Sequence, residues 1–207
     1  MLLEVVRSNY FFPFIFFLDL NNRLNYRFDS RMASNFTALV HASGSTILSG
    51  LYLSNKNKSN LLNMMAYSSG FFLFDAYDIL LHWKPSIMNY AYMYHHIASL
   101  YLINQSPDVS QGARILFWSE MSNLPSYFVY YYMKKKRSQT ILKRLKQLQI
   151  MAYSFIRIPV LGKILWDVYN SISTNDVNKT QKYTSIAIGF PVYIMGLIWT
   201  KKLYNKL

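Results

Sequence analysis

The sequence predicts an all-α membrane protein, a bundle of six to seven transmembrane helices around a central cavity. Of its 207 residues 52% are hydrophobic and only 15% are charged, whereas a soluble domain usually has about 25% charged residues. The apolar residues also gather into runs close to the roughly 20 residues that a bilayer-spanning helix needs. The basic residues lie mainly between these runs.

The apolar runs define the expected helices in chain order. The spans are expected at 36–53, 61–83, 89–103, 112–133, 148–168 and 183–199. The N-terminal run, 1–20, is a short first span, an interfacial helix or an uncleaved signal anchor. Lys84-Pro85 ends one span directly before the next, which indicates an antiparallel hairpin.

Polar stretches are expected to connect these helices. They are 21–35, 54–60, 104–111, the basic stretch 134–146 and 169–182. The run 148–168 holds Arg157, Pro159 and Lys163, so a kink is expected there. We divide the chain into an N-terminal segment with its loop (1–30), a transmembrane domain (31–202) and a short cytosolic tail (203–207).

The basic residues predict the orientation of the bundle. Seven spans place 14 basic residues on one side and five on the other, so the first side is cytosolic and the C-terminus lies with it. The sequons at Asn57 and Asn178 would then face the lumen. A net charge of +13 could suggest nucleic acid, but no recognition module is apparent, and no nucleic-acid partner is expected. Without cysteine the chain has no disulfide and no thiol chemistry.

Two adjacent histidines, His95 and His96, occupy an otherwise apolar run and are the main candidates for a functional site. Titratable side chains at membrane depth are rare and usually face the protein interior or a wet cavity. The two rings lie about 100° apart around a helix axis. They can therefore border one cavity without occupying one spot.

Nearby acidic residues are candidates to orient these imidazoles. Asp75, Asp78 and His82 follow i, i+3, i+7 spacing and share a helix face, as do Glu120 and Asn123. A carboxylate beside an imidazole stabilises its charged form and fixes its tautomer. His41, in the run 36–53, is a cavity-lining or packing residue.

Structural roles are the alternative for each candidate. The histidine pair would hydrogen-bond backbone carbonyls or tyrosines, and Asp75, Asp78 and His82 would form a polar helix end. Glu120 would form an intramembrane ion pair with Arg114 or Arg157. A metal site is not expected, because no histidine pair has i, i+3 or i, i+4 spacing.

Four segments together resemble the TLC domain family. They are "RMASNFTALVHASGST", "SSGFFLFDAYDILLH", "YMYHHIASLYLI" and "GARILFWSEMSNLPSYFVYYYMK", and the likeness extends from Arg31 to about Trp199. In ceramide synthases of this family a double histidine transfers a fatty acyl group from acyl-CoA to a sphingoid base. The resemblance places that role on His95 and His96. The synthases' Asp-x-Ser-Asp element corresponds to residues 120–123, where Glu120 replaces the first acid, Ser122 is retained and Asn123 replaces the second acid.

The resemblance implies a lipid-metabolic protein of the endoplasmic reticulum that acts on membrane lipids. The first hypothesis is an acyltransferase with His95, His96 and Glu120 as catalytic residues. Asp75, Asp78, Ser122, Asn123 and His41 would bind or orient the substrate. Acyl-CoA would be a co-substrate, with no bound cofactor. The alternative is a non-catalytic lipid-binding protein that regulates membrane lipid composition. A transporter or channel is a third reading, but no pair of broken helices supports it.

Overall fold

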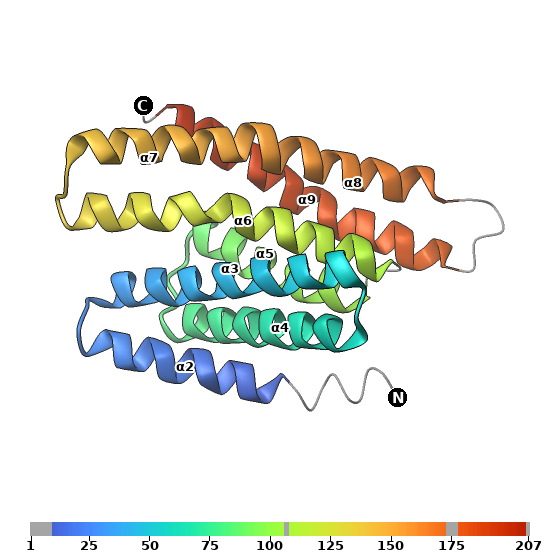
Figure 1. The fold of residues 1–207 in the computed structure, drawn as a ribbon, viewed down its shortest axis with the longest axis horizontal. Helices are drawn as coiled ribbons and strands as arrows, with labels where there is room; N and C mark the ends of the chain where they lie inside the picture. Colours follow the sequence, from blue (N-terminus) through green and yellow to red (C-terminus); the bar gives the residue numbers. More distant parts are fainter. Residues whose placement is uncertain (1–9, 106–107, 173–177, 206–207) are drawn as a thin grey trace.

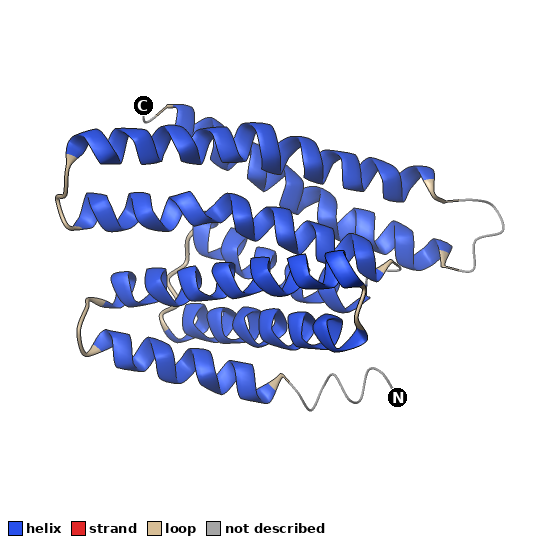
Figure 2. Cartoon of the chain, viewed as in Figure 1, coloured by secondary structure: helices blue, strands red, loops and turns tan. Residues whose placement is uncertain are grey.

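The computed structural model describes residues 10–105, 108–172 and 178–205, and these residues form helices connected by short turns (Figures 1 and 2). The predicted all-α class is confirmed. The helices are α2 (Phe11–Asn25), α3 (Ser30–Asn55), α4 (Lys58–Leu81), α5 (Ile87–Gln105), α6 (Val109–Lys134), α7 (Gln139–Met151), the π-helical segment η1 (Ala152–Arg157), α8 (Ile158–Asn170) and α9 (Lys179–Tyr204).

The helices run up and down, so that successive connections lie at opposite ends of the bundle (Figure 1). The turns at 26–29, 82–86 and 135–138 share one end with the end of α9, and the turn at 56–57, the end of α8 and the start of α9 lie at the other (Figure 1). The first end carries Arg27, Lys84 and the cluster Lys134–Arg137. We call it the basic end.

The apolar core lies mainly among α2, α3, α4 and the N-terminal half of α6. Phe17, Met64 and Phe74 are at most 1% exposed and pack with Phe71 and Leu116. Small polar residues also face one another there, and the Ser45 and Ser68 hydroxyls are 2.9 Å apart. Because α5, α6, α8 and α9 are less tightly filled between them, an interior cavity remains on that side of the bundle.

Helix α2 is part of this bundle. It packs against α3 and α4, and Phe17 from its centre is fully buried. Its 15 residues extend about 22 Å, less than the roughly 30 Å thickness of the hydrocarbon core.

The predicted loop 21–35 was wrong over most of its length, because α2 continues to Asn25 and α3 begins at Ser30. Polar residues fit within these helices by pairing. Asn21 is buried and accepts a hydrogen bond from Thr37 Oγ1 at 3.3 Å. Asp29 caps α3 by accepting from the backbone N–H of Met32, and this hydrogen bond lowers the pKa of Asp29.

The basic stretch 134–146 was also expected as a connection, and this was wrong beyond residue 138. Helix α7 starts at Gln139 and is amphipathic, with Leu142 and Ile150 buried and Lys143 and Arg144 exposed. Its apolar and basic residues recur with the period of a helix, a pattern that is typical of an amphipathic helix and not of a loop.

A kink was expected in the run 148–168, and the structure has a π-helical turn there, Ala152–Arg157. Proline lacks the N–H that would bond to the carbonyl of residue 155, and its ring crowds that carbonyl. The helix therefore widens to π-helical geometry before Pro159, and the Ile158 N–H bonds to the carbonyl of Tyr153, five residues earlier.

By length and composition, two helices in the described part of the chain qualify as membrane spans, 139–170 and 179–204. The predicted total of six to seven spans therefore stays a prediction. Large apolar side chains nevertheless cover the outside of the bundle. Phe12 is 75% exposed, Ile87 88% and Phe155 76%. Lipid is the environment in which so apolar an exterior is stable.

Candidate functional site

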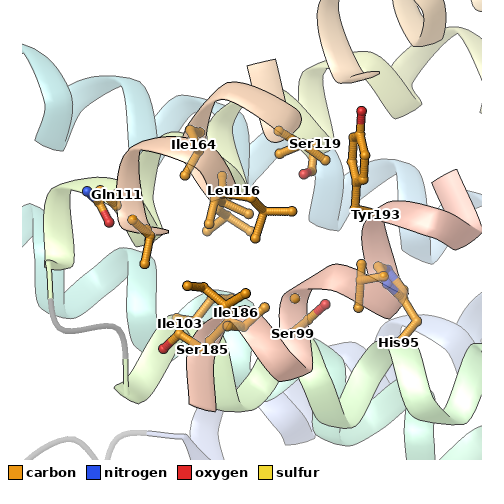
Figure 3. Close-up of a pocket in the computed structure, with 18 of the residues that line it drawn as sticks. His95, Ser99, Ile103, Gln111, Leu116, Ser119, Ile164, Ser185, Ile186 and Tyr193 are labelled. Atoms are coloured by element: carbon orange, nitrogen blue, oxygen red, sulfur yellow. The ribbon is translucent and has the colours of Figure 1, made fainter. Parts of the chain in front are cut away.

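A cavity lies between α5, α6, α8 and α9, with about 920 Å³ of empty space including its open part. Its middle is apolar, lined by residues such as Ile103, Leu116, Ile164 and Ile186 (Figure 3). His95 and Tyr193 lie at one end of the view and Gln111 at the other (Figure 3). The cavity is thus a hydrocarbon-lined space with polar groups at its ends.

His95 is the histidine that lines this cavity, together with Glu120 and Arg157. They come from the middles of α5 and α6 and from η1, so three separate helices bring them together. The Nδ1 atom of His95 is buried and has no hydrogen-bond partner among the described residues. An unpartnered buried nitrogen is costly to maintain, and at a cavity wall it is available to a ligand.

His96 lies behind His95 and is paired with an acid. Its Nε2 is 2.5 Å from Asp75 Oδ2, and its ring packs against Phe72 and is 5.4 Å from the His95 ring. It is absent from the cavity lining. The two histidines therefore differ in position: His95 lines the cavity, whereas His96 is behind the cavity wall and is paired with Asp75.

Asn123 connects Glu120 to Arg157. Its amide nitrogen donates to Glu120 Oε2 at 3.3 Å, and its carbonyl accepts from Arg157 Nη1 at 2.6 Å and from the Tyr153 hydroxyl at 2.7 Å. Arg157 is 4% exposed, and its Nε has no partner among the described residues. The neutral amide therefore holds an acid and a cation on the same cavity wall.

His41 reaches the same acid from α3. Its ring is 1% exposed and stacks on Phe71 with centroids 3.8 Å apart. Its Nδ1 lies 4.0 Å from Glu120 Oε2. Since His41 does not line the cavity, it packs beside Glu120 on the side away from the cavity.

Two of the expected site residues lie elsewhere. Ser122 is fully buried and its hydroxyl donates to the Ser119 carbonyl on its own helix. Asp78 lies at the end of α4 beside His82, whose Nδ1 is 3.4 Å from Asp78 Oδ1. Neither lines the cavity.

Arg157, Tyr153 and Tyr193 were not among the predicted site residues, and Arg157 was considered only as a structural ion-pair partner of Glu120. The run 148–168 does signal Arg157, as an arginine among apolar residues, and Tyr153 precedes it by four residues on the same face. For Tyr193, within an apolar run, no sequence signal exists, because only the rotation of α9 decides that it faces the cavity. No cluster of three metal-ligating side chains occurs in the ranges that the structure describes.

These features are those of an integral membrane protein: an all-α bundle with an apolar exterior, an apolar cavity and polar groups buried beside it. Residues 31–205 match the family model of the TLC domain, and the chain belongs to this family. No curated protein and no solved structure was found to match the chain.

Proposed function

We propose that this protein is a membrane acyltransferase that holds a fatty acyl chain in the cavity and uses His95 as its base. The observation that carries the proposal is the imidazole of His95 at a polar end of an apolar cavity, with its Nδ1 unpartnered. The apolar walls suit an acyl chain. The TLC family membership supports lipid chemistry.

The reaction that these groups permit is transfer from an acyl-CoA thioester to an amine, with a sphingoid base as the proposed acceptor. Neutral His95 removes a proton from the amine as its nitrogen bonds to the acyl carbon. The carbon–sulfur bond then breaks, and the proton passes to the leaving thiolate. Arg157, which lines the same cavity, would stabilise the negative charge that develops on the acyl oxygen.

The other polar residues act through His95 and Arg157. The Asp75 carboxylate fixes the orientation of His96, whose ring packs against His95. Asn123 fixes Arg157 relative to Glu120. Asp75 and Asn123 are therefore positioning residues in this proposal.

We also propose that the basic end faces the cytosol, with the C-terminus, in the endoplasmic reticulum. Cytosolic connections of membrane proteins carry an excess of lysine and arginine. His95 lies about midway along α5, whose first turn is near Lys84 at the basic end. A coenzyme phosphate group would meet the basic connections while the acyl chain extends past His95 toward Gln111.

A non-catalytic lipid-binding role is the second candidate, and one observation favours it. The residues that line the cavity run from the level of His95 to Gln111, Val168 and Ser185, away from the basic end. None of the residues lining it belongs to the basic connections. A protein that only binds a lipid needs no entry for coenzyme A.

The test is acyl transfer by the purified full-length protein from radiolabelled acyl-CoA to a long-chain base. His95→Ala is expected to lower the rate at least about 100-fold, the usual contribution of a general base. Asp75→Asn, which removes the charge beside His96, is expected to lower it less. His82→Ala, at the exposed end of α4, is the control and should retain the rate.

Equal rates for the wild type and His95→Ala would reject the acyltransferase. If the wild type shows no transfer yet retains fatty acid through purification, the lipid-binding role is the better account. The retained lipid would be identified by mass spectrometry.

A further inference from the structure

A second hollow lies on the outside of the bundle, between the last turns of α3 and the first turns of α6. Gly50, Leu53 and Ser54 line it from α3, Lys56 lines it from the C-cap of α3, and Arg114, Phe117 and Trp118 line it from α6. It shares no lining residue with the cavity that contains His95. We call these seven residues the α3–α6 groove.

Two cations stand at the rim of the groove. Lys56 ends α3 in the left-handed conformation (φ 52°), and its ammonium donates to Ser110 Oγ at 2.9 Å and lies 5.1 Å from the centre of the Tyr52 ring. These contacts keep the lysine at the junction of the two helices. Asp108, the neighbouring acid, caps α6 by accepting from the Ser110 N–H.

Arg114 has no acidic partner among the residues that the structure describes. It lies five residues into α6 and is exposed. An arginine near the membrane boundary extends its guanidinium toward the interface, where its five N–H donors need acceptors. Phosphate oxygens meet that need with paired hydrogen bonds.

Apart from Ser54, the rest of the groove is apolar, and Gly50 and Trp118 lie deeper in the bundle than the two cations. Gly50 precedes Lys56 by six residues and Trp118 follows Arg114 by four, so they lie about 9 and 6 Å further along their helices. A Cβ at Gly50 would approach Phe117 to 3.3 Å. Glycine thus leaves the floor of the groove open beside an aromatic ring.

We propose that the α3–α6 groove binds an anionic phospholipid, with the phosphate on Arg114 and Lys56 and an acyl chain along Leu53, Phe117 and Trp118. Cations at the rim and apolar groups below match the order of groups in such a lipid. A free phosphate or an acidic peptide would use the cations and leave the apolar floor uncovered. The site is independent of the proposed acyl transfer.

The experiment measures lipid binding to the purified full-length protein in detergent by native mass spectrometry. The probes are phosphatidylglycerol, phosphatidylcholine and glycerol phosphate. Phosphatidylglycerol is expected to bind at least about fivefold more tightly than phosphatidylcholine, and glycerol phosphate at least about tenfold more weakly. Comparable binding of glycerol phosphate, or no preference for the anionic lipid, would overturn the proposal.

Variants locate the site. Arg114→Gln is expected to weaken phosphatidylglycerol binding about tenfold and Lys56→Asn about fivefold; asparagine suits the left-handed conformation at residue 56. Lys58→Gln, an exposed residue outside the groove, is the matched control and should bind as the wild type does. Unchanged binding in an Arg114→Gln, Lys56→Asn double variant would overturn the proposal, and the melting temperature of each variant confirms its fold.

Discussion

Replacing Asn123 with alanine tests whether this amide holds the polar wall of the cavity together. The change removes the acceptor of the Arg157 and Tyr153 hydrogen bonds and the donor to Glu120. Arg157 is buried, with its Nε already unpartnered among the described residues. Each buried polar group left without a partner costs about 1–3 kcal/mol, and a charged group more.

The free energy of unfolding should therefore fall by about 2–4 kcal/mol. For a chain of this size that corresponds to a melting temperature roughly 5–15 °C lower. The assay is thermal unfolding of the full-length protein in detergent, followed by intrinsic tryptophan fluorescence. Asn89→Ala is the control, since its half-buried amide donates to the carbonyl of exposed Lys84 near the start of α5, and its melting temperature should fall by less than about 2 °C.

Asn123→Asp separates the hydrogen bonds from the charge. A carboxylate keeps the acceptors for Arg157 and Tyr153 but places a second acid about where the amide now donates to Glu120. We expect its melting temperature to fall by less than half as much as that of Asn123→Ala. If the alanine variant melts within 2 °C of the wild type, or both variants melt alike, Asn123 does not hold this wall.

Two further predictions concern packing and orientation. Gly70→Ala should lower the free energy of unfolding by about 1–3 kcal/mol, because its Cβ would lie 2.5 Å from Pro13 Cβ and 2.8 Å from the Phe14 backbone nitrogen. Gly196→Ala, with nothing within 4 Å, should not lower it, and equal losses in chemical denaturation would contradict the α2–α4 contact. For orientation, the chain lacks cysteine, so single Lys135→Cys and Lys58→Cys variants in sealed microsomes can be labelled with an impermeant maleimide. Label at residue 135 alone is expected, and the reverse pattern would refute a cytosolic basic end.

Helices α3 to α6 and α9 were predictable because their apolar runs have the length and period of buried helices. The errors lie at polar helix ends. Asn21 and Arg23 belong to α2 because one bonds to Thr37 and the other to Asp19, and such pairings are formed only once partner helices or turns are in place. Composition alone assigned both residues to a loop.

Part of the candidate site was predictable as individual residues, but its arrangement was not. The histidine pair and Glu120 are conspicuous in apolar runs. Which histidine lines the cavity depends on the rotation of α5, which turns His95 to the cavity and His96 to Asp75. Arg157 joins them from the last position of the π-helical turn before Pro159, where the wider turn gives side chains a direction that a regular α-helix would not.

The sequence by itself determined the helical class, the membrane setting and the polar residues kept within apolar runs, because periodicity and hydrophobicity are properties of local sequence. Only the tertiary structure decided which of those residues meet. Contacts such as Asn123 with Arg157, or Lys56 with Ser110, join separate helices, and their geometry depends on how each helix is rotated and shifted against its neighbours. That choice is made by packing of the whole bundle.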